Sequence, residues 1–181
     1  SITLDLRSAE GVALAKKMIA ECDVLIENFK VGSLSKLGLG YDDLKDDFPG
    51  LVYCSVTGFG QTGPYAERTG YDFLAQGLGG IMSITGAPDG EPMKVGVGIA
   101  DVMTGMYAST AILAALRHRD ATGEGQHIDT CLLDTQVSWL INEGTNYLVS
   151  GKIPTKLGNE HPNIVPYKVF GTSDGYVILA V

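Results

Sequence analysis

Residues 24–56 read VLIENFKVGSLSKLGLGYDDLKDDFPGLVYCSV, and this stretch decides the fold. Residues 24–26 and residues 51–56 are short apolar runs, the pattern of strands that are buried on both faces of a parallel sheet. Between them, residues 41–47 favour a helix, which ends at the Phe-Pro-Gly triplet that follows. Strand, helix and strand in this order predict an α/β fold built on a parallel sheet.

The same alternation extends toward the N-terminus. Residues 2–6 alternate apolar and polar side chains, which is typical of a strand. Ser8 is placed to cap a helix that we expect to run to Glu21. The chain begins inside this first strand without a methionine and stops inside a last strand, residues 176–181. We therefore expect it to be a piece of a longer protein.

Toward the C-terminus the sequence is richer in loops. Residues 58–64 read GFGQTGP and predict a loop. Helices are expected over residues 72–84 and 133–149, with a strand at 126–130 before the second. The Asp-Gly pair at 174–175 predicts a hairpin turn before the last strand.

Composition and charge exclude several classes of function. The chain has 181 residues, a net charge of −8 and a sequence pI near 4.7, which argues against a nucleic-acid partner. No apolar run reaches the roughly 18 to 20 residues that a membrane span needs, and no signal peptide opens the chain. Cysteines and histidines are scattered without the spacing of a metal site or a disulfide framework: Cys22, Cys54, Cys131, His118, His127 and His161. We expect a cytoplasmic protein with reduced thiols and no metal.

Asp101 is the first candidate for chemistry. It follows the sequence Gly-Val-Gly-Ile-Ala and opens a helix that we expect to run to Arg119. Backbone N–H groups and the helix dipole at that position favour an ionised carboxylate, as a nucleophile requires. Alternatively, Asp101 simply caps the helix, which is the commoner role of aspartate at a helix start. The residue pattern alone favours the cap.

The second candidate is the segment directly after the apolar run 24–26. It lies where a parallel strand ends, and ligands of open α/β sheets bind at that edge. Asn28 could hydrogen-bond a ligand, Phe29 could pack on an adenine ring, and Lys30 or Lys36 could meet phosphate. The alternative is that Asn28 is a turn residue, Phe29 is a core aromatic, and Lys30 and Lys36 are solvated. On the residues alone this alternative is slightly favoured.

Taken in order, several motifs resemble the class III CoA-transferases, a family that includes the formyl-CoA, carnitine and succinyl-CoA-dependent enzymes. They span essentially the whole chain: residues 1–6 (SITLDL), 24–29 (VLIENF), 38–41 (GLGY), 53–55 (YCS), 58–64 (GFGQTGP), 70–72 (GYD), 97–101 (VGIAD), 122–126 (TGEGQ) and 161–167 (HPNIVPY). Each motif is weak alone, and the ordered set is strong. Residues 60–64 and 164–167 look somewhat like the corresponding segments of members that use succinyl-CoA.

The resemblance implies an enzyme that moves CoA from an acyl-CoA donor to a small carboxylic acid. Asp101 matches the family's catalytic aspartate, which passes through a mixed anhydride and an aspartyl-CoA thioester. CoA and acyl-CoA are then substrates, and no permanently bound cofactor is implied. The nearest alternative is an α-methylacyl-CoA racemase of the same fold, and the other is a non-catalytic nucleotide-binding α/β module.

Two segments match the family's CoA-binding positions: Asn28, Phe29, Lys30 and Lys36 from the first, and Arg68, Thr69, Gly70 and Tyr71 from the second. The resemblance implies that Phe29 lies near the adenine, and that the second segment runs beside the pantetheine and Asp101. Lys30-Val31 replaces the family's common Arg-Pro. Lys36 stands where an arginine is frequent, and lysine keeps the charge but loses the bidentate hydrogen bonds. Tyr71 stands where racemases carry a histidine base, and a tyrosine hydroxyl, with an ordinary pKa of about 10, is a poor base at neutral pH.

The resemblance also implies how the chain is organised. Residues 1–150 correspond to a Rossmann-like α/β CoA-binding domain without its first βα unit, and residues 151–181 to the start of a linker and a smaller domain. Family members are interlocked dimers, so a homodimer is expected, with no nucleic-acid or membrane partner. The location implied is the cytoplasm, or the mitochondrial or peroxisomal matrix in a eukaryote.

Overall fold

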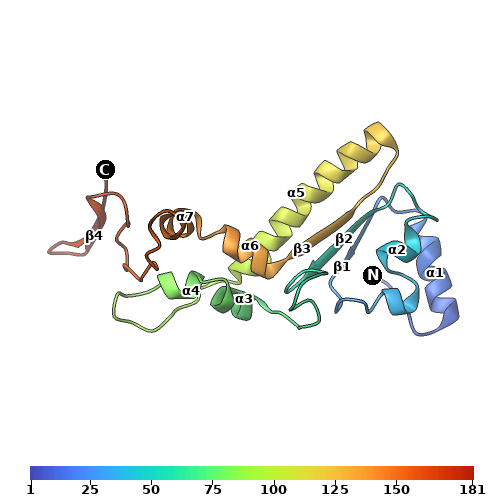
Figure 1. The fold of residues 1–181 in the computed structure, drawn as a ribbon, viewed down its shortest axis with the longest axis horizontal. Coiled ribbons are helices and arrows are strands. Elements are labelled where there is room, and N and C mark those ends of the chain that lie inside the picture. The colour runs from blue at the N-terminus through green and yellow to red at the C-terminus, as the bar shows by residue number, and fades with distance from the viewer.

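A three-stranded parallel sheet forms the centre of the molecule (Figure 1). The computed structural model describes residues 1–181. β1 (Val24–Glu27), β2 (Val52–Thr57) and β3 (His127–Cys131) lie in that order, and both pairings are parallel. β2 is almost completely buried because it has a neighbouring strand on each side. The predicted α/β fold with a parallel sheet is confirmed.

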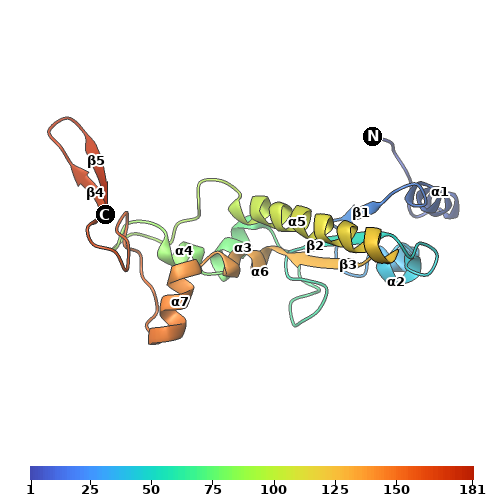
Figure 2. The same ribbon diagram turned by 90° about the horizontal axis from the view of Figure 1, so that it is seen from above.

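Two helices pack beside this sheet (Figures 1 and 2). α1 (Ala9–Ile19) lies on the side of β1, and Ser8 caps it as predicted, because its hydroxyl accepts a hydrogen bond from the N–H of Gly11 at 3.0 Å. α5 (Ile99–Thr122), the longest helix, packs along β2 and β3. The chain returns from the end of α5 into β3, so α5 begins at the edge where the strands end (Figure 1).

A small apolar core lies between β2 and the segment before it. The short helices η1 (Ser35–Leu37) and α2 (Tyr41–Leu44) bring leucines of this segment against the ring of Tyr53. The Tyr53 hydroxyl donates a hydrogen bond to the carbonyl of Leu39 at 3.1 Å. Burial raises the pKa of Tyr53 well above its usual value, so the hydroxyl remains a donor. This core fixes the chain between β1 and β2.

α3 (Asp72–Leu78) and α4 (Ile81–Ile84) replace the single helix predicted over residues 72–84. The break occurs because Gly80 adopts a φ of 90°, in the left-handed region that glycine enters without a steric penalty. A methyl group on Gly79 would also collide with the side chain of Gln136. Close packing of α3 against the helix that carries Gln136 thus requires glycine at the break.

α6 (Leu132–Ser138) and α7 (Ile141–Ser150) likewise replace the helix predicted over residues 133–149. The chain turns at Ile141, which adopts a φ of 44°, a conformation that is unfavourable for a β-branched residue. α6 packs against α3 and α5, whereas α7 leads away from the parallel sheet (Figure 2).

Three further predictions about element ends are corrected. Residues 2–6 form no strand, because no strand of the sheet pairs with them. The helix predicted over residues 41–47 is reduced to the single turn of α2. α5 begins at Ile99 with Gly98 in the N-cap position, so Asp101 is not the cap of its own helix.

β4 (Tyr167–Gly171) and β5 (Tyr176–Ala180) form the predicted antiparallel hairpin. The N–H of Thr172 donates to the carbonyl of Gly175 at 2.9 Å and closes the turn. The hairpin lies at the end of the molecule remote from the N-terminus, and its apolar side chains are largely exposed (Figure 2). The domain boundary expected at residue 150 falls at the end of α7, and the division into domains stays a prediction.

α5 is the one helix long and apolar enough to cross a membrane by length and composition. Polar residues such as Thr104 interrupt its sequence, so α5 meets this criterion without containing a continuous apolar run. Thr104 is fully buried, and its hydroxyl donates to the carbonyl of Ala100 at 2.6 Å. Only 22% of this apolar stretch is buried in the structure, where α5 packs on β2, β3 and α6. Core helices of soluble proteins that meet the same criterion are mostly buried.

The loop of residues 58–70 closes on itself at its two terminal glycines. A methyl group on Gly58 would lie 2.4 Å from the Cα of Gly70, and one on Gly70 would lie 2.5 Å from the Cα of Gly58. The carboxylate of Asp129 on β3 accepts a hydrogen bond from the N–H of Gln61 at 2.9 Å. The predicted loop is therefore held both at its base and along its length, in the manner of a compact Ω-loop.

Gly70→Ala is expected to lower the free energy of unfolding by about 1–3 kcal/mol, because two backbone segments in contact must separate. Gly96→Ala is the matched control: no atom lies within 4 Å of the methyl group it would add. Urea denaturation of the whole protein measures both changes. If Gly70→Ala were as stable as Gly96→Ala, the closure of the loop at this contact would be wrong.

Candidate active site

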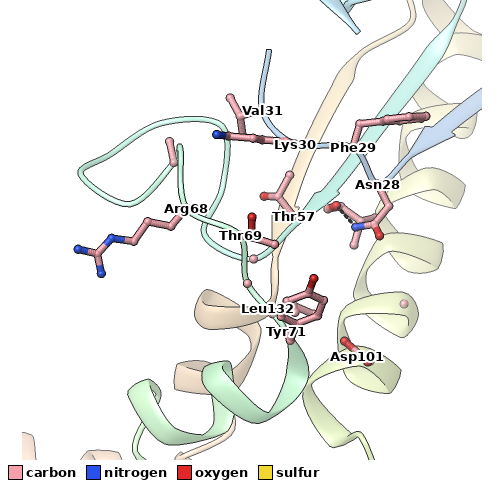
Figure 3. A pocket seen from close by; sticks show the side chains of 15 residues that line it. Asn28, Phe29, Lys30, Val31, Thr57, Arg68, Thr69, Tyr71, Asp101 and Leu132 are labelled. Carbon is pink, nitrogen blue, oxygen red and sulfur yellow. Dashed lines mark hydrogen bonds between the residues drawn. The ribbon is translucent and has the colours of Figure 1, made fainter. Parts of the chain in front are cut away.

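A cavity of about 520 Å³ opens where β1 and β2 end (Figure 3). Its walls come from the segment after β1, the end of β2, the loop 58–70, the first turns of α5 and the start of α6. It brings together eight of the residues that the sequence predicted for the site: Asn28, Phe29, Lys30, Arg68, Thr69, Gly70, Tyr71 and Asp101. Val56, Thr57 and Leu132 also line it, and these were not predicted; only the position of Val56 and Thr57 at a strand end could have indicated them.

Lys36 is the one predicted residue that the structure does not bring to the cavity. It lies in η1 and is exposed. Leu34 and Leu37, on either side of it, turn into the leucine core, which leaves Lys36 facing solvent. Gly32 bends the chain between Lys30 and Lys36 with a φ of 76°, and nothing in the pattern revealed the direction of that bend.

Asn28 and Phe29 follow β1 directly and occupy the rim of the cavity (Figure 3). The side-chain amide of Asn28 donates to the carbonyl of Val56, which ties the segment after β1 to the end of β2. The carboxylate of Glu27 accepts a hydrogen bond from the N–H of Phe29 at 2.7 Å. The Phe29 ring is 51% exposed, so one face is free to pack on a flat ligand.

Lys30 and Arg68 provide the positive charge of the cavity, and both extend to the side away from Asp101 (Figure 3). The Arg68 guanidinium lies 4.1 Å from the centre of the Tyr65 ring, which in turn meets Phe59 edge-on at 5.5 Å. Neither Lys30 nor Arg68 forms an ion pair with a carboxylate of the chain. This end of the cavity therefore suits an anionic group such as phosphate.

Asp101 is the third residue of α5, and its carboxylate lines the cavity (Figure 3). Asp101 is exposed as a whole residue, but partial desolvation of its carboxylate, followed by the nearby carboxylate of Asp72, raises its pKa above the ordinary aspartate value. This reverses the prediction that the helix start favours the ionised form. The reason is that Asp72 already accepts the N–H groups of the first turn, from Ala100 at 2.8 Å and from Asp101 at 3.3 Å.

Asp72 contacts the start of α5 beside Asp101, and the sequence pattern did not single it out as a site residue. It directly follows Tyr71 at the start of a predicted helix, where an aspartate normally caps its own helix. In the structure it makes no such cap on α3, and its side chain reaches the start of α5 instead. That contact joins residues 28 positions apart in the sequence, so no local pattern reveals it.

Tyr71 projects into the cavity near Asp101, and its side chain is largely exposed (Figure 3). No histidine lines the cavity. The His127 ring is hydrogen-bonded to the Ser55 hydroxyl at 3.0 Å, and Nδ1 of His161 accepts N–H groups of its own loop at 3.1 Å. The position that would carry a histidine base in a racemase is therefore filled by a tyrosine alone.

The three cysteines are free, and none of them lines the cavity. Burial raises the pKa values of the Cys54 and Cys131 thiols, which keeps them protonated at neutral pH. No group of three or more His, Cys, Asp or Glu side chains lies close enough together to hold a metal ion. The reactive side chains that face the cavity are thus Asp101 and Tyr71, with Lys30 and Arg68 as its cations.

Comparison with known proteins shows relatives along the full length of this chain. It is 56% identical over 181 residues to the succinate–glutarate CoA-transferase of Agrobacterium fabrum, covering 100% of this chain and 45% of that protein. It is 44% identical over 179 residues to the succinyl-CoA:glutarate CoA-transferase of Homo sapiens, covering 99% of this chain and 41% of that protein. The chain thus spans less than half the length of these curated relatives.

A solved structure and a family model agree with these relatives. The crystal structure of a CAIB/BAIF family protein from Brucella suis is similar with a TM-score of 0.91 and 57% sequence identity, covering 99% of this chain and 48% of that chain. The family model described as CoA-transferase family III matches residues 1–181. The resemblance seen in the ordered motifs is confirmed, and the chain belongs to CoA-transferase family III.

Proposed function

We propose that the whole protein transfers CoA from an acyl-CoA to a carboxylic acid, with Asp101 as the covalent nucleophile. The observation that carries this proposal is the environment of the Asp101 carboxylate. It lies in the cavity where β1 and β2 end, it has no hydrogen-bond or ion-pair partner, and partial desolvation and Asp72 raise its pKa. A carboxylate without donors is a stronger nucleophile than one stabilised by them.

The first half of the reaction removes the donor acid. An Oδ atom of Asp101 attacks the carbonyl carbon of the acyl-CoA thioester, the C–S bond breaks, and CoA leaves as a thiolate. The product is a mixed anhydride between Asp101 and the donor acid. The thiolate then attacks the Asp101 carbonyl carbon, releasing the donor carboxylate and leaving an aspartyl-CoA thioester. Covalent catalysis thus divides one difficult exchange into easier steps.

The second half runs these steps in reverse with the acceptor acid. The acceptor carboxylate attacks the carbonyl carbon of the aspartyl thioester, which expels the thiolate and forms a second mixed anhydride. The thiolate attacks the acceptor's carbonyl carbon, the product acyl-CoA forms, and the carboxylate of Asp101 is restored. Each step replaces one anion by another, so no proton has to be transferred.

The arrangement of the cavity suggests how CoA is bound. We propose that Phe29 packs on the adenine, that Lys30 and Arg68 meet phosphate, and that residues 69–71 line the channel beside the pantetheine. In support, the Phe29 ring is half exposed and both cations are free of ion pairs. Asn28, whose amide N–H is used by Val56, offers its side-chain oxygen to the ligand.

Three further parts of the proposal concern features outside the cavity. Lys36 is proposed to meet a phosphate at the outer end of CoA, since it is exposed and lies beyond Lys30 along the chain. A homodimer is proposed because apolar side chains of α7 and the β4–β5 hairpin, such as Leu148 at 83% and Tyr176 at 85% exposure, lack a covering partner. A cytoplasmic location is proposed on the resemblance to the family.

The substrates are proposed to be dicarboxylic acids. The names of the two relatives reported above pair succinate or succinyl-CoA with glutarate. At 56% and 44% identity over nearly the whole chain, these relatives make succinyl-CoA the first donor to test and glutarate the first acceptor.

Asp101→Ala in the whole protein is expected to reduce CoA transfer by roughly a thousandfold or more, because the group that forms the covalent bond is removed. Wild-type protein incubated with succinyl-CoA should carry a hydroxylamine-sensitive adduct on the peptide that contains Asp101, detected by mass spectrometry. Asp101→Asn should lack it, and Asp47→Asn, which changes an exposed aspartate outside the cavity, should retain both adduct and turnover. Transfer at the wild-type rate by Asp101→Ala would contradict the assignment.

The transferase is also expected not to exchange the α-proton of its substrate. A racemase needs a second base beside the α-carbon in addition to Asp101, and at that position the cavity offers Tyr71 and no histidine. A 2-methylacyl-CoA incubated in deuterium oxide should therefore gain no deuterium at the α-position during many turnovers of CoA exchange. Deuterium incorporation at a rate comparable with CoA transfer would favour the racemase instead.

A further inference from the structure

The start of α5 is capped by a side chain from another helix. Asp72 is the first residue of α3, and its Oδ1 atom accepts hydrogen bonds from the N–H groups of Ala100 and Asp101. The N-cap residue of α5 itself is Gly98, which has no side chain to offer. Asp72 therefore caps α5 from α3, whereas an aspartate in this role usually caps the helix that it begins.

Gln76, one turn later on α3, holds Asp72 in this position. Its side chain is completely buried, and its amide N–H₂ donates to Oδ2 of Asp72 at 2.7 Å. Its carbonyl oxygen accepts the N–H of Val95 at 2.8 Å, in the segment that leads into α5. Gln76 thus fixes both the carboxylate that caps α5 and the backbone that enters it.

The two carboxylates both lie close to the backbone of Gly98. A methyl group on Gly98 would lie 3.6 Å from Oδ1 of Asp72 and 3.7 Å from Oδ2 of Asp101. Asp72 is fully occupied by the N–H groups of α5 and by Gln76, whereas the carboxylate of Asp101 has no partner. The remaining charged groups of the cavity, Lys30 and Arg68, extend away from Asp101 (Figure 3).

We propose that Asp72 and Gln76 are positioning residues for Asp101: by capping α5 from α3, they leave the Asp101 carboxylate unpaired and directed into the cavity. If Asp72 were absent, the Asp101 side chain could fold back onto the free N–H groups of its own helix, as helix-start aspartates do. There it would be both misdirected and stabilised, and therefore a weaker nucleophile. The inference rests on the proposed role of Asp101.

Two substitutions of Asp72 separate the cap from the charge. Asp72→Ala removes both, and kcat for CoA transfer should fall by about 30-fold or more with less than about a threefold change in KM for acyl-CoA. Asp72→Asn keeps an oxygen that can accept the N–H groups of α5 but places its N–H₂ against the amide of Gln76 and loses that hydrogen bond. Its kcat should therefore fall by about fivefold, less than in Asp72→Ala. Asp89→Asn, which alters an exposed aspartate in a turn outside the cavity, should behave as the wild type.

The pH profile distinguishes positioning from a merely structural role. The charge of Asp72 contributes to the raised pKa of Asp101, and Asp101 must be ionised to attack. Loss of the Asp72 charge lowers the pKa of Asp101. The acidic limb of the pH profile of kcat/KM should therefore move to lower pH in both Asp72 variants. A variant that only loosens the fold would lose rate without moving this limb. If Asp72→Ala does not fold, Asp72→Asn still provides the test, because it retains the cap.

Gln76→Met, which keeps the length of the side chain and removes its hydrogen bonds, should reduce kcat through Asp72. The combined loss in Asp72→Ala/Gln76→Met should then be smaller than the product of the two single losses, because both changes act in part on one cap. Wild-type rates in Asp72→Ala, or fully additive losses in the double variant, would overturn the inference. The hydroxylamine-sensitive adduct on Asp101 of the wild type tests the proposed function separately. If the adduct is absent, the proposed function fails. If it is present, a negative result with Asp72→Ala overturns only the positioning roles.

Discussion

The parallel pairing of β2 with both of its neighbours is the constraint from which the site follows. Parallel strands end at one edge of a sheet, so the segments that leave β1, β2 and β3 all emerge side by side. Asn28, Gly58 and Leu132 stand just after these three strands, and all of them line the cavity. α5 runs back along the sheet before β3 begins, and its first turn therefore lies at the same edge (Figure 1).

The sequence predicts those parts of the structure that depend on short-range patterns. The apolar runs of β1 and β2, the cap at Ser8 and the glycine-rich loop after Thr57 each carry their signal within a few residues. Residues 2–6 show the limit of such patterns, since their alternation resembles a strand and no strand pairs with them. The break at Gly80 comes from its left-handed backbone conformation. The apolar pattern runs through this position without interruption, so periodicity alone does not predict the break.

Eight of the nine candidate site residues lie in one cavity, but the electrostatics of that cavity could not be predicted from the sequence. Asp101 was identified through its motif, and the expected support from its own helix start was wrong because Asp72 takes those N–H groups. This contact depends on the packing of α3 against α5, a tertiary contact that no local sequence pattern predicts. The cavity has its unpaired carboxylate at one end and its free cations at the other (Figure 3). Such a local separation of charge allows an acidic chain, with a pI near 4.7, to accept an anionic ligand.

Whether a reaction moves protons decides which side chains its site needs, and the side chains of this cavity can be compared with that need. In the proposed transfer, a carboxylate attacks, a thiolate leaves and a carboxylate is regenerated, so the reaction needs no acid or base. Racemisation of an acyl-CoA would instead require a group that removes a proton from carbon, and such a group works best with a pKa near the operating pH. A two-base racemase needs such a group in addition to Asp101. The structure places Tyr71 and Asp72 there; no histidine lines the cavity, and the Asp72 carboxylate already accepts three hydrogen bonds. A cavity that holds one unpaired carboxylate and no histidine thus matches a reaction in which acyl groups move and protons do not.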